Sequence, residues 1–139
     1  MKISTKLRYA SRLLSALAET GSIINTSDLG NRLNVSPLYL RPIALELEKR
    51  GIIKSHRGAR GGYQLLKPPS EITLYELAKI FGDFTLADCL DDPDICANSS
   101  VCRARNLWLN LRNCIESFLK GVTIEDLMTD KEKTLKEQI

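Results

Sequence analysis

The stretch that decides the fold runs from Ser36 to Leu66 and reads S-P-L-Y-L-R-P-I-A-L-E-L-E-K-R-G-I-I-K-S-H-R-G-A-R-G-G-Y-Q-L-L. Ser36 and Pro37 suit the N-cap and the first position of a helix, and Gly51 is suited to end it after Arg50. Two short apolar runs, 52–55 and 63–66, then flank a connection rich in glycine and arginine. This pattern predicts a helix followed by a two-stranded β-hairpin.

The residues before this stretch predict two further helices. Apolar side chains recur with helical spacing between residues 5 and 19, and Gly21 is expected to close that helix. Thr26 or Ser27 is the expected cap of a short second helix that ends near Leu33. Three helices and a hairpin predict a winged helix-turn-helix, a mainly α fold with a small β-hairpin wing (α+β).

The rest of the chain predicts a division into four parts. Residues 1–82 are expected to form the winged helix-turn-helix domain for DNA binding, and 83–102 a cysteine-rich loop. Residues 103–128 are expected to form a dimerisation helix with a C-terminal segment, and 129–139 a mobile tail. The dimerisation helix itself should run from about Cys102 to Lys120.

The charge is divided unevenly between the two halves of the chain. Residues 1–70 contain twelve Lys and Arg against four Asp and Glu, whereas residues 71–139 contain eight against thirteen. A basic N-terminal half indicates contact with a polyanion, and we expect that polyanion to be double-stranded DNA. No apolar run approaches the length of a membrane span and no secretory signal is visible, so we expect a cytoplasmic protein without a membrane partner.

The expected DNA face combines the wing with the first turns of the third helix. Arginine on a glycine-rich hairpin can enter a narrow minor groove, and the start of a reading helix reaches bases and phosphates. Residues near the first helix can add phosphate contacts. The candidate DNA-binding residues are Lys2, Ser4, Thr5, Arg8, Ser36, Tyr39, Arg41, Arg57 and Arg60.

Pro42 complicates the reading helix, because it would be the sixth residue of a helix that begins at Pro37. A proline there removes a backbone hydrogen bond at a cost of about 3 kcal/mol. We therefore expect either a kink at Pro42 or a regular helix that starts near Leu40.

Three cysteines stand close together in a loop rich in Pro, Asp, Asn and Ser, C-LDDPDI-C-ANSSV-C from Cys89 to Cys102. Without an export signal, such thiols are more typical of metal binding or redox chemistry than of disulfide bonds. Either these cysteines bind something, or they pair with one another. We expect Cys102 in the first turn of the following helix, capped by Ser99 or Ser100.

The long helix carries apolar side chains spaced by three and four residues along one side, which predicts a seam for another helix. A small winged helix has little surface left to cover it. We therefore expect a homodimer that places its two reading units about one DNA turn apart, or a multiple of it, on a palindrome-like operator. The seam residues are Leu107, Trp108, Leu111, Cys114, Ile115 and Phe118.

Several of these motifs together resemble the Rrf-two family of transcriptional regulators, which includes iron–sulfur regulators of the IscR and NsrR types. They are M-K-I-S-T-K-L-R-Y-A, S-P-L-Y-L, L-E-K-R-G-I-I, R-G-A-R-G-G-Y-Q-L, I-T-L-Y-E-L-A, the three cysteines and L-W-L-N-L with F-L-K-G-V-T-I-E-D-L. The resemblance implies a dimeric regulator whose Cys89, Cys96 and Cys102 hold an iron–sulfur cluster. It also implies that Arg57 enters the minor groove.

The chain departs from that family pattern at the fourth cluster ligand. Arg105 stands where the iron-regulator branch has histidine, and Arg8 stands where the nitric-oxide branch has a ligating aspartate. His56, the one histidine, falls on the wing, where a surface role or a role near DNA is expected. Three cysteines without histidine favour, by analogy, a 4Fe-4S cluster over a 2Fe-2S cluster.

The resulting hypothesis is a regulator that senses iron, nitric oxide or redox state through this cluster. The same scaffold could instead respond to thiol oxidation or zinc, or bind a protein partner and not DNA. No enzyme is expected, because there is no second histidine, nucleophile elbow or phosphate-binding loop.

Overall fold

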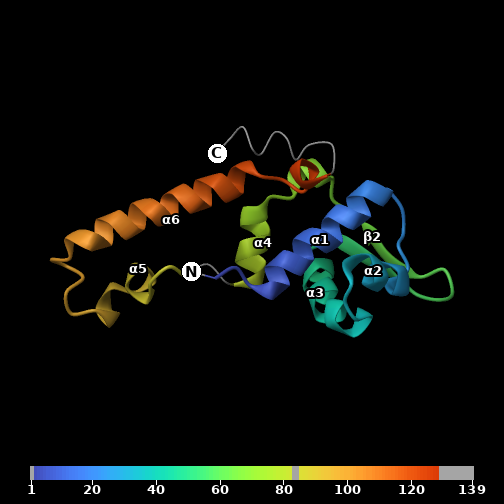
Figure 1. The fold of residues 1–139 in the computed structure, drawn as a ribbon, viewed down its shortest axis with the longest axis horizontal. Coiled ribbons are helices and arrows are strands. Elements are labelled where there is room, and N and C mark those ends of the chain that lie inside the picture. The colour runs from blue at the N-terminus through green and yellow to red at the C-terminus, as the bar shows by residue number, and fades with distance from the viewer. Residues whose placement is uncertain (1, 83–84, 129–139) are drawn as a thin grey trace.

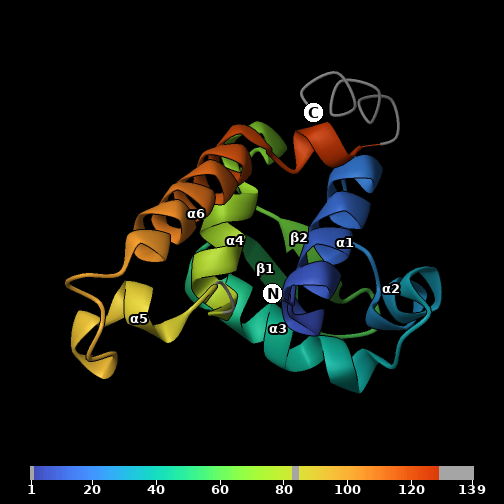
Figure 2. The same cartoon turned by 60° about the vertical axis from the view of Figure 1, so that its left-hand side comes forward.

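The helical body of the molecule lies at one end, and a long helix extends from it (Figures 1 and 2). The computed structural model describes residues 2–82 and 85–128, so the predicted mobile tail lies outside the described residues. The elements in chain order are α1 (Thr5–Thr20), α2 (Thr26–Leu33), α3 (Pro37–Lys49), β1 (Ile53–His56), β2 (Gly62–Leu65), η1 (Pro69–Glu71), α4 (Leu74–Phe81), α5 (Asp88–Asp91), η2 (Pro93–Ile95), α6 (Arg103–Gly121) and η3 (Glu125–Leu127).

Short polar side chains and glycine set the ends of the first helices. Ser4 accepts a hydrogen bond from the Leu7 amide at the start of α1, and Gly21 ends that helix in the left-handed conformation, as expected. The cap of α2 is Asn25, whose Oδ1 accepts from the Ser27 amide at 2.8 Å. The prediction of Thr26 or Ser27 as that cap is wrong by one residue, because Asn25 is the residue with extended dihedrals here.

Helix α3 runs unbroken from Pro37 to Lys49 with Pro42 inside it, and Ser36 caps it as predicted. The expectation that the regular helix starts only near Leu40 is therefore wrong. Pro42 is exposed, and the carbonyl that its missing amide would have bonded belongs to Leu38, which is also exposed. Water can reach that carbonyl, so the lost hydrogen bond is tolerated.

The wing is an antiparallel hairpin of β1 and β2 in which Ile53 pairs with Leu65 and His56 with Gly62. Ile24, from the segment before α2, forms an isolated bridge with Tyr63 and brings two further backbone hydrogen bonds to the hairpin. A side chain on Gly62 would collide with the Ile24 backbone, so this close approach requires glycine.

One hydrophobic core joins the helices to the inner faces of the hairpin. It is completed by a segment from beyond α6: Ile124 is fully buried in it, and Val122, two residues before, is buried as well. The Ile124 amide donates to the Ile72 carbonyl and the Leu74 amide to the Val122 carbonyl, each at 2.9 Å. The chain therefore leaves the body after α4 and returns to it after α6, as Figure 1 shows.

The fold is thus mainly helical with a two-stranded antiparallel hairpin, as the sequence predicted. Among the described residues, no helix is both long and apolar enough to cross a membrane.

Candidate DNA-binding face and cysteine loop

The start of α3 presents a mixed surface. Ser36 and Arg41 are exposed, whereas Tyr39 is half-buried and packs edge-on against Tyr9 at 5.3 Å between ring centroids. Ser36 uses its hydroxyl to accept from the Leu38 amide at 3.2 Å. Of the three α3 residues expected to contact DNA, Arg41 therefore has the freest side chain, and Tyr39 also has a packing role.

Leu38 is a surface residue that the sequence prediction left out of the DNA face. Its side chain is 77% exposed in the first turn of α3, beside Ser36. The sequence could have indicated this exposure, because Leu38 falls outside the helical stripe of Leu40, Ala44 and Leu47 that faces the core.

The wing tip carries Arg57 and Arg60, both exposed, on a turn in which Gly58 has φ +96°. The wing is tied to α3 by Glu48, which accepts from the Ser55 hydroxyl at 2.8 Å and from the Ser55 amide at 3.2 Å. These hydrogen bonds lower the pKa of Glu48 below its ordinary value. The reading helix and the wing therefore form one connected surface.

His56 also belongs to the wing, where its Nε2 lies 2.8 Å from Oε1 of Gln64. This contact joins the two strands and agrees with the expectation that His56 serves the wing surface.

The candidate phosphate-binding residues at the start of α1 differ in their freedom. Lys2, Thr5 and Arg8 are exposed, and Arg8 donates to the Thr5 hydroxyl at 3.4 Å. Ser4 is half-buried and committed to capping α1. These residues lie at or just before the start of α1, whereas the wing arginines lie on the turn between β1 and β2.

The three loop cysteines fall on three consecutive features of the chain. Cys89 is in α5, Cys96 follows η2, and Cys102 is the N-cap of α6. All are free thiols; Cys89 and Cys96 are half-buried and Cys102 is exposed. Cys102 therefore lies just before α6. The expectation that it lies in the first turn of this helix is wrong.

The expected capping of this helix by Ser99 or Ser100 is not found. Cys102 is the cap and makes no side-chain hydrogen bond there, and the Ser99 hydroxyl instead donates to the Pro93 carbonyl at 2.6 Å. This bond closes the loop between η2 and α6, which explains why Ser99 is not available to the helix.

Two arginines from α6 reach back to the cysteine loop. Arg105 donates from Nε to the Cys89 carbonyl at 3.4 Å. Arg112 donates to the Leu90 carbonyl at 3.4 Å and pairs with Asp91 at 3.0 Å. Arg105, where the resemblance led us to look for a histidine ligand, is thus a hydrogen-bond donor to the backbone of Cys89. Sequence reasoning missed both contacts, because no local pattern links residues 16 and 21 positions apart.

The cysteine loop has the donor chemistry of an iron–sulfur site, since it offers three accessible thiols on one short segment. Within residues 2–82 and 85–128, however, no three His, Cys, Asp or Glu side chains are grouped so as to hold a metal ion. The three cysteines are thus the right type of ligand for an iron–sulfur cluster. Binding of a cluster would require their three sulfur atoms to come closer together.

Helix α6 has no buried residue in the single chain. Leu107 is 60% exposed, Trp108 45%, Leu111 41% and Phe118 42%. Cys114 is exposed as well and Ile115 is half-buried. An apolar groove of about 550 Å³ continues this stripe towards the start of α1, where Ile3 and Leu7 line it together with Phe118.

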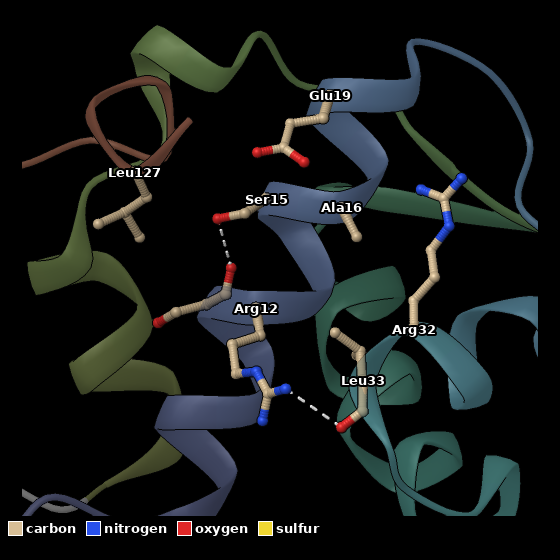
Figure 3. A pocket seen from close by; sticks show the side chains of 8 residues that line it. Arg12, Ser15, Ala16, Glu19, Arg32, Leu33 and Leu127 are labelled. Atoms are coloured by element: carbon tan, nitrogen blue, oxygen red, sulfur yellow. Dashed lines mark hydrogen bonds between the residues drawn. The ribbon is translucent and has the colours of Figure 1, made fainter. Parts of the chain in front are cut away.

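A second hollow, of about 420 Å³, lies beside α1 and is lined by Arg12 and Arg32 (Figure 3). Both arginines are already engaged. Arg12 donates to the Leu33 carbonyl at 3.2 Å and lies over the Tyr9 ring, and Arg32 donates to the Thr20 hydroxyl at 2.9 Å. These side chains tie α1 to α2, so this hollow marks the junction of two helices.

Comparison with known proteins places the chain in a family. Residues 3–130 match the family model Rrf2, described as an iron-dependent transcriptional regulator. The chain belongs to the Rrf2 family. CymR of Bacillus subtilis, an HTH-type transcriptional regulator, is 33% identical over 91% of this chain and 89% of its own.

Solved structures support the assignment of this chain to the Rrf2 family. T. potens IscR has a TM-score of 0.74 at 25% identity, covering 96% of this chain and 90% of that one. The oxidised form of Staphylococcus aureus CymR has a TM-score of 0.74 at 31% identity, covering 93% and 97%. The protein is a winged-helix transcriptional regulator, and DNA binding follows from that role.

Proposed function

We propose that this Rrf2 regulator binds a palindrome-like DNA site as a homodimer and that its cysteine loop holds an iron–sulfur cluster, whose presence sets the affinity for DNA. The observation that carries the proposal is the position of Cys89, Cys96 and Cys102. All three are free thiols on the segment that joins the winged-helix body to α6. A change in that segment can alter how two reading units are placed relative to each other.

The chemistry of the loop supports iron as the bound metal. Thiolates are the ligands that iron–sulfur clusters use, and the family model is described as iron-dependent. Cys89, Cys96 and Cys102 would hold the cluster, with 4Fe-4S favoured over 2Fe-2S because the loop contains no histidine. A bound cluster would make the protein responsive to iron supply, nitric oxide or oxidants.

The surface of α6 supports a second copy of the chain as partner. Its stripe of exposed and half-buried side chains has helical spacing and consists of Leu107, Trp108, Leu111, Cys114, Ile115 and Phe118. Exposed apolar surface of this extent is costly in water and marks an interface. The groove at Phe118 extends this surface to α1, so both helices can contribute to a twofold contact.

The DNA face follows from the exposed residues of α3 and the wing. Arg57 and Arg60 suit a minor groove, Arg41 suits a guanine or a phosphate, and Leu38 suits the methyl group of thymine. Glu48 and Ser55 hold the wing beside the reading helix. Lys2, Ser4, Thr5 and Arg8 remain candidates for phosphate contacts, with Ser36 and Tyr39 at the start of α3.

A second candidate function is a thiol-redox or zinc-dependent switch on the same scaffold. It is favoured by the free cysteines, which are not gathered into a metal-holding group in the described part of the chain. The similarity to S. aureus CymR, a protein seen in an oxidised form, points the same way.

DNA titrations distinguish the two functions. A site selected from randomised duplexes is titrated with protein that is anaerobically iron-loaded, metal-free and reduced, zinc-loaded, or treated with diamide. The cluster function predicts a change in affinity of about tenfold or more between the first two forms. If the iron-loaded and the metal-free, reduced forms bind DNA with equal affinity, and the affinity changes only after treatment with diamide or zinc, the second candidate function is correct and the cluster function is wrong.

A further inference from the structure

Helix α5, which carries Cys89, has a fixed place against α6 (Figure 2). Leu90 is 5% exposed, although it lies outside the main hydrophobic core of the body. The four-residue α5 is too short to be stable alone. Its position must therefore depend on contacts with α6, its neighbour in space.

Arg105 and Arg112 provide these contacts. They are seven residues apart on α6, so they lie two turns apart on the same side of the helix. Arg105 binds the carbonyl of Cys89, and Arg112 binds both the carbonyl of Leu90 and the carboxylate of Asp91. Three consecutive residues of α5 are thus each held by a guanidinium from α6.

The two arginines differ from their neighbours on the helix. Both are half-buried, whereas Arg103, one residue after Cys102, is exposed and its side chain contacts no partner in the described residues. The strongest of these contacts is the charge-assisted pair of Arg112 with Asp91 at 3.0 Å, and the two bonds to carbonyl oxygens are longer, at 3.4 Å each. Arg105 and Arg112 therefore orient α5, and Arg103 does not.

We infer that Arg105 and Arg112 are positioning residues that clamp the Cys89 segment to α6 and so couple the state of the cysteine loop to the dimerisation helix. The coupling rests on the proposed function, whereas the clamp itself does not need it. When the loop rearranges to bring its sulfur atoms together, a movement of Cys89 pulls on these contacts and so acts on α6 or breaks the clamp. Either event changes how α6 meets its partner.

Hydrogen–deuterium exchange of the full-length, reduced, metal-free protein tests the clamp. In R105Q, R112Q and Asp91→Asn, amide exchange over residues 88–92 should rise, on the order of fivefold. Exchange in α1 to α4 should stay unchanged. R103Q and Asp94→Asn are the matched controls, because neither side chain is engaged in the described part of the chain.

A charge swap provides the rescue. Arg112→Asp combined with Asp91→Arg should bring exchange over 88–92 back to within about twofold of wild type, because the pair is restored with its polarity reversed. Exchange in R105Q and R112Q equal to wild type, or an equal rise in R103Q, would overturn the clamp.

Iron release from the loaded protein separates this inference from the proposed function. R112Q should lose iron to a chelator about threefold faster than wild type, and the charge swap should reverse this. Unchanged release would overturn the positioning role of Arg112. Failure of every variant, wild type included, to take up iron would overturn the cluster proposal, while the exchange data would still decide the clamp.

Discussion

Gly30 lies within α2, packed against the turn that leads to α3, and its surroundings leave no space for a side chain. A β-carbon there would lie 2.8 Å from the Val35 carbonyl oxygen and 3.1 Å from the Pro37 ring. The Val35 amide also donates to the Gly30 carbonyl at 2.9 Å. The tight turn of the reading unit therefore depends on glycine at this position.

Gly30→Ala should lower the free energy of unfolding by about 1–3 kcal/mol, because the new methyl group must displace backbone. Gly121→Ala is the control, since nothing lies within 4 Å of a β-carbon at that helical position. It should be neutral or stabilising by up to about 1 kcal/mol. Urea unfolding measures both, and equal stability of Gly30→Ala and wild type would contradict the packing described.

At the residue scale, the sequence predicted Ser36 as a helix cap and Gly21 as a helix end, because each stands alone beside a clear periodic segment. It could not choose among the neighbouring polar residues of N-T-S, where Asn25 is the cap. Ser99 was assigned to α6 for the same reason, although its hydroxyl bonds to Pro93. Local preference does not reveal competition from a distant acceptor.

The wing and the reading helix are linked by Glu48, and this link depends on pH. Hydrogen bonds from Ser55 lower the pKa of Glu48 in the folded protein below its ordinary value of 4.5. Because the pKa of Glu48 is lower in the folded state than in the unfolded state, the ionised carboxylate stabilises the folded protein at pH values above the unfolded-state pKa. This stabilisation is lost as the pH falls through the folded-state pKa.

Glu48→Gln should therefore lower the melting temperature at pH 7, because a neutral amide accepts weaker hydrogen bonds from Ser55. The difference from wild type should shrink to nothing as the pH falls well below 4.5. Thermal unfolding monitored by circular dichroism from pH 3 to 7 measures this. Glu71→Gln, at an exposed site, should show no such trend; a pH-independent difference for Glu48→Gln would refute the link.

At the element scale, periodicity and end signals predicted α1, α2, α3, α6 and the hairpin within one or two residues, whereas α5 lies in the segment that was predicted as a loop. Contacts between elements were not predictable in this way. The return of Val122 and Ile124 to the core, and the reach of Arg112 to α5, join residues far apart in sequence. Such pairings depend on how the whole chain folds.

At the scale of the whole molecule, the proposed homodimer rests on α6, which buries none of its residues in a single chain. Leu107→Asp and Leu111→Asp should convert a dimer into monomers in analytical ultracentrifugation while circular dichroism keeps its helical signal. Neither side chain belongs to the buried core, with Leu107 60% and Leu111 41% exposed in the single chain, so their replacement should leave the core intact.

Asn113→Asp is the control for added charge, since Asn113 is exposed on α6 outside the apolar stripe. It should leave the dimer intact. A wild-type protein that sediments as a monomer would refute the role given to α6.

The cysteine loop shows where prediction from the sequence stops at this scale. Spacing identified Cys89, Cys96 and Cys102 as a set, whereas the structure leaves them apart and assigns them to α5, the end of η2 and the start of α6. Whether they converge depends on a bound group, which the amino-acid sequence does not contain.

The central claim is tested most directly by iron and acid-labile sulfide analysis of the anaerobically reconstituted protein and its four single Cys→Ser variants. Wild type and Cys114→Ser should hold roughly four iron and four sulfide per chain, and Cys89→Ser, Cys96→Ser and Cys102→Ser far less. A wild-type protein without sulfide, or a Cys96→Ser variant that keeps its full content, would contradict the account.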